Sequence, residues 1–235
     1  MYAFNLFIFV MILLGAHSLD CNYPKGDSNF YVPMTRKAQF FLREAELMAM
    51  EATDSVLPNR QLTTKIRLDM EAIRAQFPIV RNITHRKKWA PGKLRFQSIS
   101  PDDLRRINET EYGPIKIRHL NIRYRAVENT LNITYLNFPK LYNPLVLGPA
   151  LLEMLGIESE PVMSIFRDGD DTIFNAETSN YIFVKGSGKC FISCEQKHFW
   201  LFMVKCNKNR EVVLIKDYMV RYNTLDSPVP TDLFI

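Results

Sequence analysis

The segment WAPGKLRFQSISPDDLRRIN, residues 89–108, predicts a strand followed directly by a helix. The strand is expected over residues 93–98, where apolar and basic side chains alternate. Ser100 can cap the helix, the proline after it suits the first turn, and Asp102 and Asp103 suit the positive end of the helix dipole. The segment therefore supplies the first two elements of the predicted fold.

The chain after this segment predicts two further strands, a helix and a last strand. The strands are expected over residues 115–125 and 131–138. The helix is expected over residues 143–156, where Gly156 suits the position just after a helix end. Residues 161–166 form the last expected strand. The order β-α-β-β-α-β predicts a split βαβ, or ferredoxin-like, antiparallel sheet with two helices on one face.

Helices are expected before this core and strands after it. The helices, over residues 35–53 and 64–77, form a helical hairpin. The predicted class is α+β: a ferredoxin-like β-α-β-β-α-β core with an N-terminal helical hairpin and a C-terminal β-hairpin extension. The expected segments are 1–18 (signal peptide), 19–88 (N-terminal segment with the hairpin), 89–166 (ferredoxin-like core) and 167–235 (disulfide-stapled β extension and tail).

The first 18 residues, MYAFNLFIFVMILLGAHS, predict a secretory signal peptide. The apolar run over residues 4–14 is too short to span a bilayer, and Ala16-His17-Ser18 forms a small-x-small cleavage pattern. No Lys or Arg precedes the run, so the alternative is an uncleaved segment that anchors the protein to a membrane. We expect a secreted, extracellular protein. Three Asn-x-Thr sequons are candidate glycosylation sites, at Asn82, Asn108 and Asn132.

The four cysteines suggest two disulfides in an oxidising compartment. If residues 198–206 form one strand, its ends lie about 27 Å apart. Bonded cysteines need Cα atoms within about 7 Å, so we expect Cys190–Cys194 as a loop staple and Cys21–Cys206 as a second bond. A redox-active role for Cys190 and Cys194 would need a lowered thiol pKa, and no helix N-terminus is predicted beside them.

The net charge of +5 is concentrated in residues 81–125, which carry 12 basic and 4 acidic side chains. Outside the cell, such a patch favours glycosaminoglycan or anionic lipid headgroups as a partner. The alternative is a solvated face that keeps the protein soluble. Nucleic acid is not an expected partner. The candidate polyanion-binding residues are Arg86, Lys87, Lys88, Lys116, Arg118, Arg123 and Arg125.

The basic contact face is expected on the strand at residues 115–125. The apolar side chains of this strand change phase between Ile117 and Leu120, so we expect a β-bulge there that keeps them all on one face. A glycan on Asn132 of the next strand would then share the exposed face with the basic side chains. That face would carry Lys116, Arg118, Asn121, Arg123 and Arg125.

No motif for catalysis, cofactor binding or metal binding is complete in the sequence. A β-turn explains Asp168-Gly-Asp-Asp171 more simply than a calcium site does. An extracellular enzyme whose site is assembled from distant residues, such as His198 with Asp217 and Ser193, is a further alternative. We expect neither a cofactor nor a metal.

Three motifs, in order, resemble a group of uncharacterised secreted bacterial proteins. Residues 89–94 resemble a W-x-P-G-x-L opening, and residues 143–161 are similar to an N-P…L-P-G-V-x-x-A-E-P segment. Residues 188–194, followed by residues 199–202, are similar to G-D-C-P-x-G-C followed by Y-W-Y-F. The resemblance covers about residues 66–206. It implies no activity, because the group has none established.

Two of these elements, the W-x-P-G-x-L opening at residues 89–94 and Gly156 followed by Glu160-Pro161, also resemble subtilisin-type propeptides. Such propeptides have ferredoxin-like folds and act as folding chaperones and inhibitors of their protease. The resemblance implies a propeptide-like inhibitor of subtilisin-type proteases as an alternative function. The leading expectation is a non-enzymatic, N-glycosylated, extracellular binding or interaction protein with a basic surface.

Overall fold

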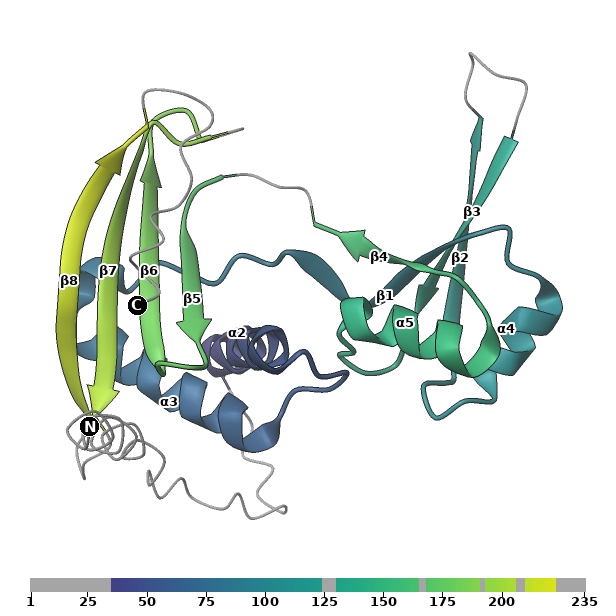
Figure 1. The fold of residues 1–235 in the computed structure, drawn as a ribbon, viewed down its shortest axis with the longest axis horizontal. Coiled ribbons are helices and arrows are strands. Elements are labelled where there is room, and N and C mark those ends of the chain that lie inside the picture. Colours follow the sequence, from purple (N-terminus) through teal and green to yellow (C-terminus); the bar gives the residue numbers. More distant parts are fainter. Residues whose placement is uncertain (1–34, 124–129, 165–167, 191–192, 206–209, 223–235) are drawn as a thin grey trace, which may run out of the picture.

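The computed structural model describes residues 35–123, 130–164, 168–190, 193–205 and 210–222. They form two lobes, each built on a four-stranded antiparallel sheet (Figure 1). The predicted α+β class is confirmed. The elements are α2 (Arg36–Thr53), α3 (Arg60–Gln76), η1 (Pro78–Val80), β1 (Trp89–Gln97), α4 (Pro101–Asn108), β2 (Lys116–Arg123), β3 (Thr130–Asn137), α5 (Pro144–Leu155), β4 (Glu160–Met163), β5 (Asp171–Asn175), β6 (Asn180–Ser187), β7 (Gln196–Lys205) and β8 (Glu211–Arg221).

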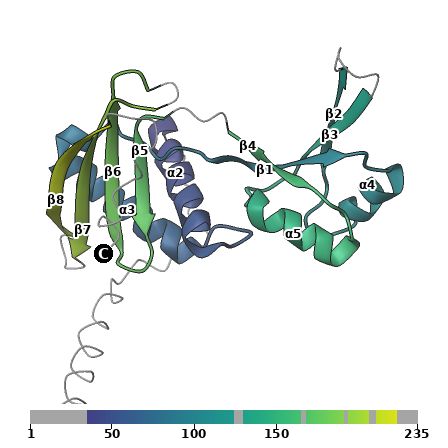
Figure 2. The same cartoon turned by 45° about the horizontal axis from the view of Figure 1, so that its top comes forward.

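The first sheet has the strand order β2-β3-β1-β4. Its six elements follow the predicted order β-α-β-β-α-β. Helices α4 and α5 lie together on one side of the sheet, and Figure 2 shows no described helix on the other side. The ferredoxin-like assignment itself stays a prediction. The core between sheet and helices includes Leu94, Phe96 and Leu136 from the strands and Ile107, Leu147 and Leu151 from the helices.

Local signals place the ends of these two helices. Ser100 Oγ accepts a hydrogen bond from the Asp103 N–H at 3.1 Å, and the Asp103 carboxylate accepts from the Ser100 N–H. This capping box begins α4. The side chain of Asn143 caps α5, which continues through Pro149 and ends before Gly156, whose φ of 70° is left-handed. The sequence thus determines both helix starts through side chains that satisfy free backbone N–H groups.

The second sheet, in the order β5-β6-β7-β8, packs on the helical hairpin of α2 and α3. The strands after residue 167 therefore form their own sheet. The helical hairpin of the predicted segment 19–88 and the strands of the predicted segment 167–235 share one hydrophobic core. The boundaries of the predicted segments stay a prediction. The fully buried members of the shared core include Ala45, Ala49, Ile66 and Ile73 from the helices and Tyr181, Phe183 and Phe202 from the strands.

Strand β5 was not expected from the sequence. The chain bends at Gly169, and β5 begins at Asp171, which pairs with Val184 of β6. The five residues of β5, DTIFN, contain only one change from polar to apolar side chains. This pattern is too short to identify a strand from the sequence alone. Strand β5 matters because it places Asp171 beside residues 81–88, which join the two lobes.

Residues 81–88, which we call the connector, run from the hairpin to β1 (Figure 1). The second link between the lobes runs from β4 to β5. The lobes also touch directly, because Leu47 and Met50 of α2 pack on Trp89 at the start of β1. The Asn143 N–H donates to the Val56 carbonyl at 2.8 Å, which joins α5 to the turn between α2 and α3.

Candidate polyanion-binding face

The side of the first sheet opposite α4 and α5 carries four basic side chains in two rows across three strands. Leu94 is buried on the helix side of the sheet, so its neighbours Lys93 and Arg95 point to the other side. Directly opposed residues of antiparallel strands point to the same face. We call this set with its central tyrosine the basic face: Lys93, Arg95, Lys116, Arg118 and Tyr135. The rows, from β1 through β3 to β2, are Lys93-Asn137-Lys116 and Arg95-Tyr135-Arg118.

Strand geometry sets the spacing of these cations. Neighbouring strands lie about 4.8 Å apart, so β1 and β2 are separated by about 10 Å. Residues two apart on a strand are separated by about 7 Å. The backbones thus hold four positive side chains at the corners of a rectangle, with Tyr135 between two of them.

Most of this charge is not neutralised by any residue that the structure describes. Lys93, Lys116 and Arg118 are exposed, and within the described part of the chain none of them has an ion-pair partner. Arg95 is half-buried and forms an ion pair with Glu160 of β4. Four clustered cations against one carboxylate leave a strong positive potential, which attracts polyanions.

The sequence reasoning missed Lys93 and Arg95. Both lie on β1, outside the strand at residues 115–125 where the basic face was expected. They join Lys116 and Arg118 only because β3 lies between β1 and β2. The alternation of Lys93 and Arg95 with the apolar Leu94 indicated that both basic side chains point away from the core. Only the strand order shows that they share a face with Lys116 and Arg118.

The predicted β-bulge in β2 is wrong. The pairing of β2 with β3 runs without a shift from Lys116 opposite Asn137 to Arg123 opposite Thr130. Positions 121 and 123 therefore alternate in the phase opposite to positions 116 and 118, so the predicted single basic face over the whole strand is not formed. Position 132 pairs with position 121, so the sequon does not share the phase of Lys116 and Arg118. Arg125 lies outside the described residues.

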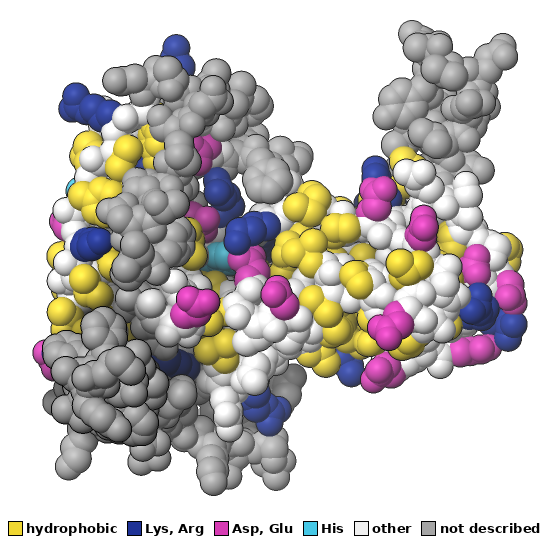
Figure 3. Space-filling model, in the orientation of Figure 1, with side chains coloured by type: hydrophobic (Ala, Val, Ile, Leu, Met, Phe, Trp, Pro, Cys, Tyr) yellow, Lys and Arg dark blue, Asp and Glu magenta, His cyan; other side chains and the backbone are white. Residues whose placement is uncertain are grey.

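The other predicted basic residues lie on the connector, away from the basic face. Arg86 is 3.5 Å from Asp168 and 3.6 Å from Asp171, and Lys88 Nζ is 2.8 Å from a carboxylate oxygen of Glu51. Lys87 is exposed. Figure 3 shows Lys and Arg side chains mixed with carboxylates between the two lobes. Arg86 and Lys88 therefore serve internal ion pairs, which makes them weaker candidates for a polyanion.

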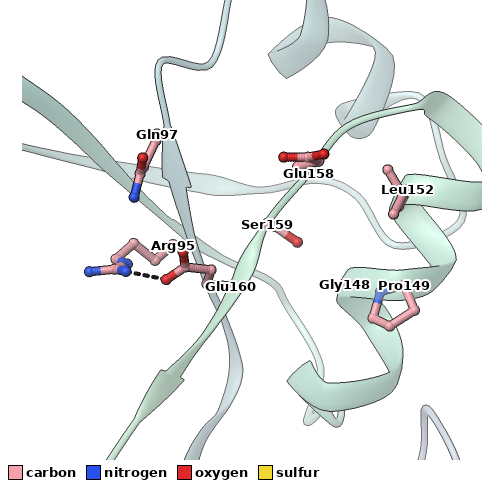
Figure 4. A pocket seen from close by; sticks show the side chains of 8 residues that line it. All are labelled: Arg95, Gln97, Gly148, Pro149, Leu152, Glu158, Ser159 and Glu160. Carbon is pink, nitrogen blue, oxygen red and sulfur yellow. Dashed lines mark hydrogen bonds and ion pairs between the residues drawn. The ribbon is translucent and has the colours of Figure 1, made fainter.

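A cavity of about 340 Å³ borders the basic face at the edge of the first sheet (Figure 4). Pro149 and Leu152 of α5 form its apolar side. The Arg95–Glu160 ion pair lies on the opposite side, and the Ser159 side chain points toward α5 (Figure 4). With Glu158 also in its lining, this cavity is less positive than the basic face.

The Cys190–Cys194 disulfide is confirmed, with the two Cα atoms 4.0 Å apart. Asp168 holds this loop: its carboxylate accepts from the Cys194 N–H at 2.7 Å and lies 2.7 Å from Lys197 Nζ. Burial raises the pKa of Asp168, but the contacts with Lys197 and the Cys194 N–H outweigh it, so the pKa lies below its usual value. Cys21 and Cys206 lie outside the described residues, and their pairing stays a prediction.

The residues of the enzyme alternative are partly brought together. His198 Nε2 contacts the Asp217 carboxylate across β7 and β8, and the imidazole stacks on Trp200 at 3.9 Å between ring centroids. The cavity of Figure 4 is not lined by these residues or by Ser193, and neither is a second cavity, of about 110 Å³, which Glu51 and His85 help to line. Cys190 is held in its disulfide.

The sequons at Asn82 and Asn108 are at exposed positions. The Asn108 side chain already accepts a hydrogen bond from the Ile115 N–H at 3.0 Å. Asn132 lies in β3. Glycosylation at all three stays a prediction.

Comparisons with known proteins give no relatives. No protein-family model, no curated protein and no solved structure matches the chain. Across the ranges that the structure describes, no helix has the length and apolar character needed to cross a membrane, and no group of histidine, cysteine and acidic residues is arranged to hold a metal ion. The resemblances to the bacterial group and to propeptides stay predictions.

Proposed function

We propose that this protein is an extracellular binding protein for a sulfated polyanion of the glycosaminoglycan type, and that it binds through the basic face. The observation that carries the proposal is the pair of cross-strand rows, which place four cations on a sheet face that no described helix covers. The extracellular setting rests on the predicted signal peptide.

The basic face has the chemistry that such a ligand requires. Guanidinium groups can donate two parallel hydrogen bonds to a sulfate or carboxylate, and lysines add compact positive charge. The phenol of Tyr135, between Arg95 and Arg118, adds one hydrogen-bond donor. Because all of these residues project from paired strands, little backbone ordering is needed on binding.

The inhibitor alternative has less support. A propeptide-type inhibitor needs a free tail directly after its fourth strand, to enter the protease cleft. Here β4 is followed by β5, which is paired with β6 in the second sheet. The place of such a tail is therefore taken by the link between the lobes.

Retention on immobilised heparin tests the proposal. We expect the protein to bind at low salt and the Lys116→Ala plus Arg118→Ala variant to elute at clearly lower NaCl. The matched control removes the exposed Lys189 and Lys205 of the second lobe, with the same change in net charge. Equal elution of the two double variants, or no retention of the native protein, would reject the basic face as the binding site.

A further inference from the structure

His85 is a buried histidine at the centre of the connector. Its side chain is only 3% exposed and lies between α2 and β5. A cavity of about 110 Å³ beside it is lined by Glu51, His85 and Lys88 on its polar side and by Met48 and Phe174 on its apolar side. The imidazole therefore lies where the hairpin, the second sheet and the path to β1 meet.

The hydrogen bonds of the ring define its protonation state. Nδ1 lies 2.7 Å from the carbonyl oxygen of Thr172, and Nε2 lies 3.1 Å from a carboxylate oxygen of Glu51. A carbonyl oxygen and an ionised carboxylate can only accept, so each ring nitrogen must donate. Lys88 Nζ, 2.8 Å from the other Glu51 oxygen, favours the ionised carboxylate. Two donating nitrogens make the ring an imidazolium.

We infer that His85 is a proton-operated latch, which ties the connector to α2 and β5 while the ring is protonated and opens when the proton leaves. A neutral ring keeps one N–H, and the shorter bond to Thr172 favours keeping it on Nδ1. Nε2 would then present a lone pair to the Glu51 carboxylate, and two acceptors repel each other. The neighbouring cavity gives Glu51 and Lys88 room to separate from the ring.

The charges around the ring favour its protonated form. Glu51 of α2 and Asp171 of β5 face it, with an Asp171 oxygen 3.6 Å from Nδ1. Lys88 and Arg86 of the connector bind these same two carboxylates. Glu44 of α2, which is paired with Arg74 of α3, accepts a hydrogen bond from the His85 backbone N–H.

The pKa of His85 follows from these groups. Burial lowers the pKa, but the hydrogen bond and charge of Glu51, the charge of Asp171 and the bond to the Thr172 carbonyl together raise it above 6.5. A raised folded-state pKa means that the stabilisation is fully present below the unfolded value and is lost as the pH rises through the folded value. The latch is therefore closed below the folded pKa of His85 for as long as the Glu51 carboxylate stays ionised, and it opens toward alkaline pH.

The consequence of opening reaches the first lobe. The connector continues directly into β1, and the Lys88 carbonyl accepts a hydrogen bond from the Ser164 N–H just after β4 at 3.0 Å. Loss of the latch would free the segment that leads to the strand bearing Lys93 and Arg95. The inference concerns the joint between the lobes and does not depend on polyanion binding.

Ring nitrogen NMR tests the protonation state. We expect both nitrogens of His85 to be protonated at about pH 6 and the ring to titrate above 6.5. Glu51→Gln should lower the midpoint, since it removes the carboxylate, whereas Glu177→Gln in an exposed turn should not. His85 is assigned by His85→Gln. A single protonated nitrogen at about pH 6, or a midpoint unchanged by Glu51→Gln, would overturn the inference.

Backbone hydrogen exchange of residues 83–88, corrected for the intrinsic pH dependence of exchange, tests the opening. Above the folded pKa, we expect protection of the native connector to fall up to about tenfold for each unit by which the folded pKa exceeds the unfolded one. In Glu51→Gln the fall should be smaller and should begin at lower pH. Protection that does not change through the His85 titration would reject the latch.

Discussion

Breaking the ion pair between Glu44 of α2 and Arg74 of α3 tests how the helical hairpin holds the connector. Both side chains are buried, and the pair is bidentate, with two N–O distances of 2.8 Å. Arg74 also donates to the Ile83 carbonyl at 2.6 Å, and Glu44 accepts from the His85 N–H at 2.6 Å. The pair therefore connects both helices to the connector.

The expected cost follows from desolvation. Glu44→Leu or Arg74→Met alone leaves the other charge buried without its counter-ion, which costs about 3–5 kcal/mol. If the two effects were independent, the double variant would lose about 6–10 kcal/mol. The double variant, however, buries no charge and orphans only the Ile83 carbonyl and the His85 N–H, which we expect to cost about 2–4 kcal/mol in total.

Urea unfolding followed by far-ultraviolet circular dichroism measures the three variants. We expect the double variant to be more stable than the sum of the single effects predicts, by about 2–8 kcal/mol. If either single variant is too unstable to fold, the double variant should still give a cooperative transition. Additive effects of the two substitutions would refute the buried-pair reasoning.

Three further predictions concern the core, a close backbone approach and acid sensitivity. Ile73→Ala, in the core shared by the hairpin and the second sheet, should cost about 2–5 kcal/mol in urea unfolding, and a loss below about 1 kcal/mol would contradict the shared core. Gly92 and Gly156 both have a left-handed φ, so alanine is strained at either position. Gly92→Ala should destabilise the protein more than Gly156→Ala, because only at Gly92 would the new Cβ lie 2.4 Å from a carbonyl oxygen. Equal melting temperatures of the two variants would contradict this. Asp168 has a lowered pKa, so its stabilisation is present above the ordinary value of 3.8 and is lost as the pH falls through the folded value. Asp168→Asn should therefore lose less stability on acidification than the native protein, and parallel profiles of unfolding free energy against pH would contradict the assignment.

Elements set by local side-chain chemistry were predictable from the sequence. Ser100 and Gly156 mark helix ends through hydrogen bonds and backbone conformations that involve neighbouring residues only. Cys190–Cys194 was predictable for a related reason, since the strand expected over residues 198–206 was too long for Cys206 to pair with either cysteine.

Features that depend on distant pairing were not predictable in the same way. The bulge in β2 was inferred by assuming that every apolar side chain of a strand faces the core, yet Ile117 is 45% exposed at the edge of the sheet. The core shared by α3 and β7 joins residues more than 100 positions apart, and no local pattern encodes that contact. Lys93 and Arg95 became candidates only once the strand order was known.

Mass-spectrometric footprinting of lysine acetylation, with and without a heparin oligosaccharide, tests the central claim most directly. The account predicts that the ligand protects Lys93 and Lys116, on the two outer strands of the basic face, from acetylation. Lys189 and Lys205 of the second lobe should react equally in both states. Protection of the second-lobe lysines with no change at Lys93 and Lys116 would contradict the assignment of the basic face.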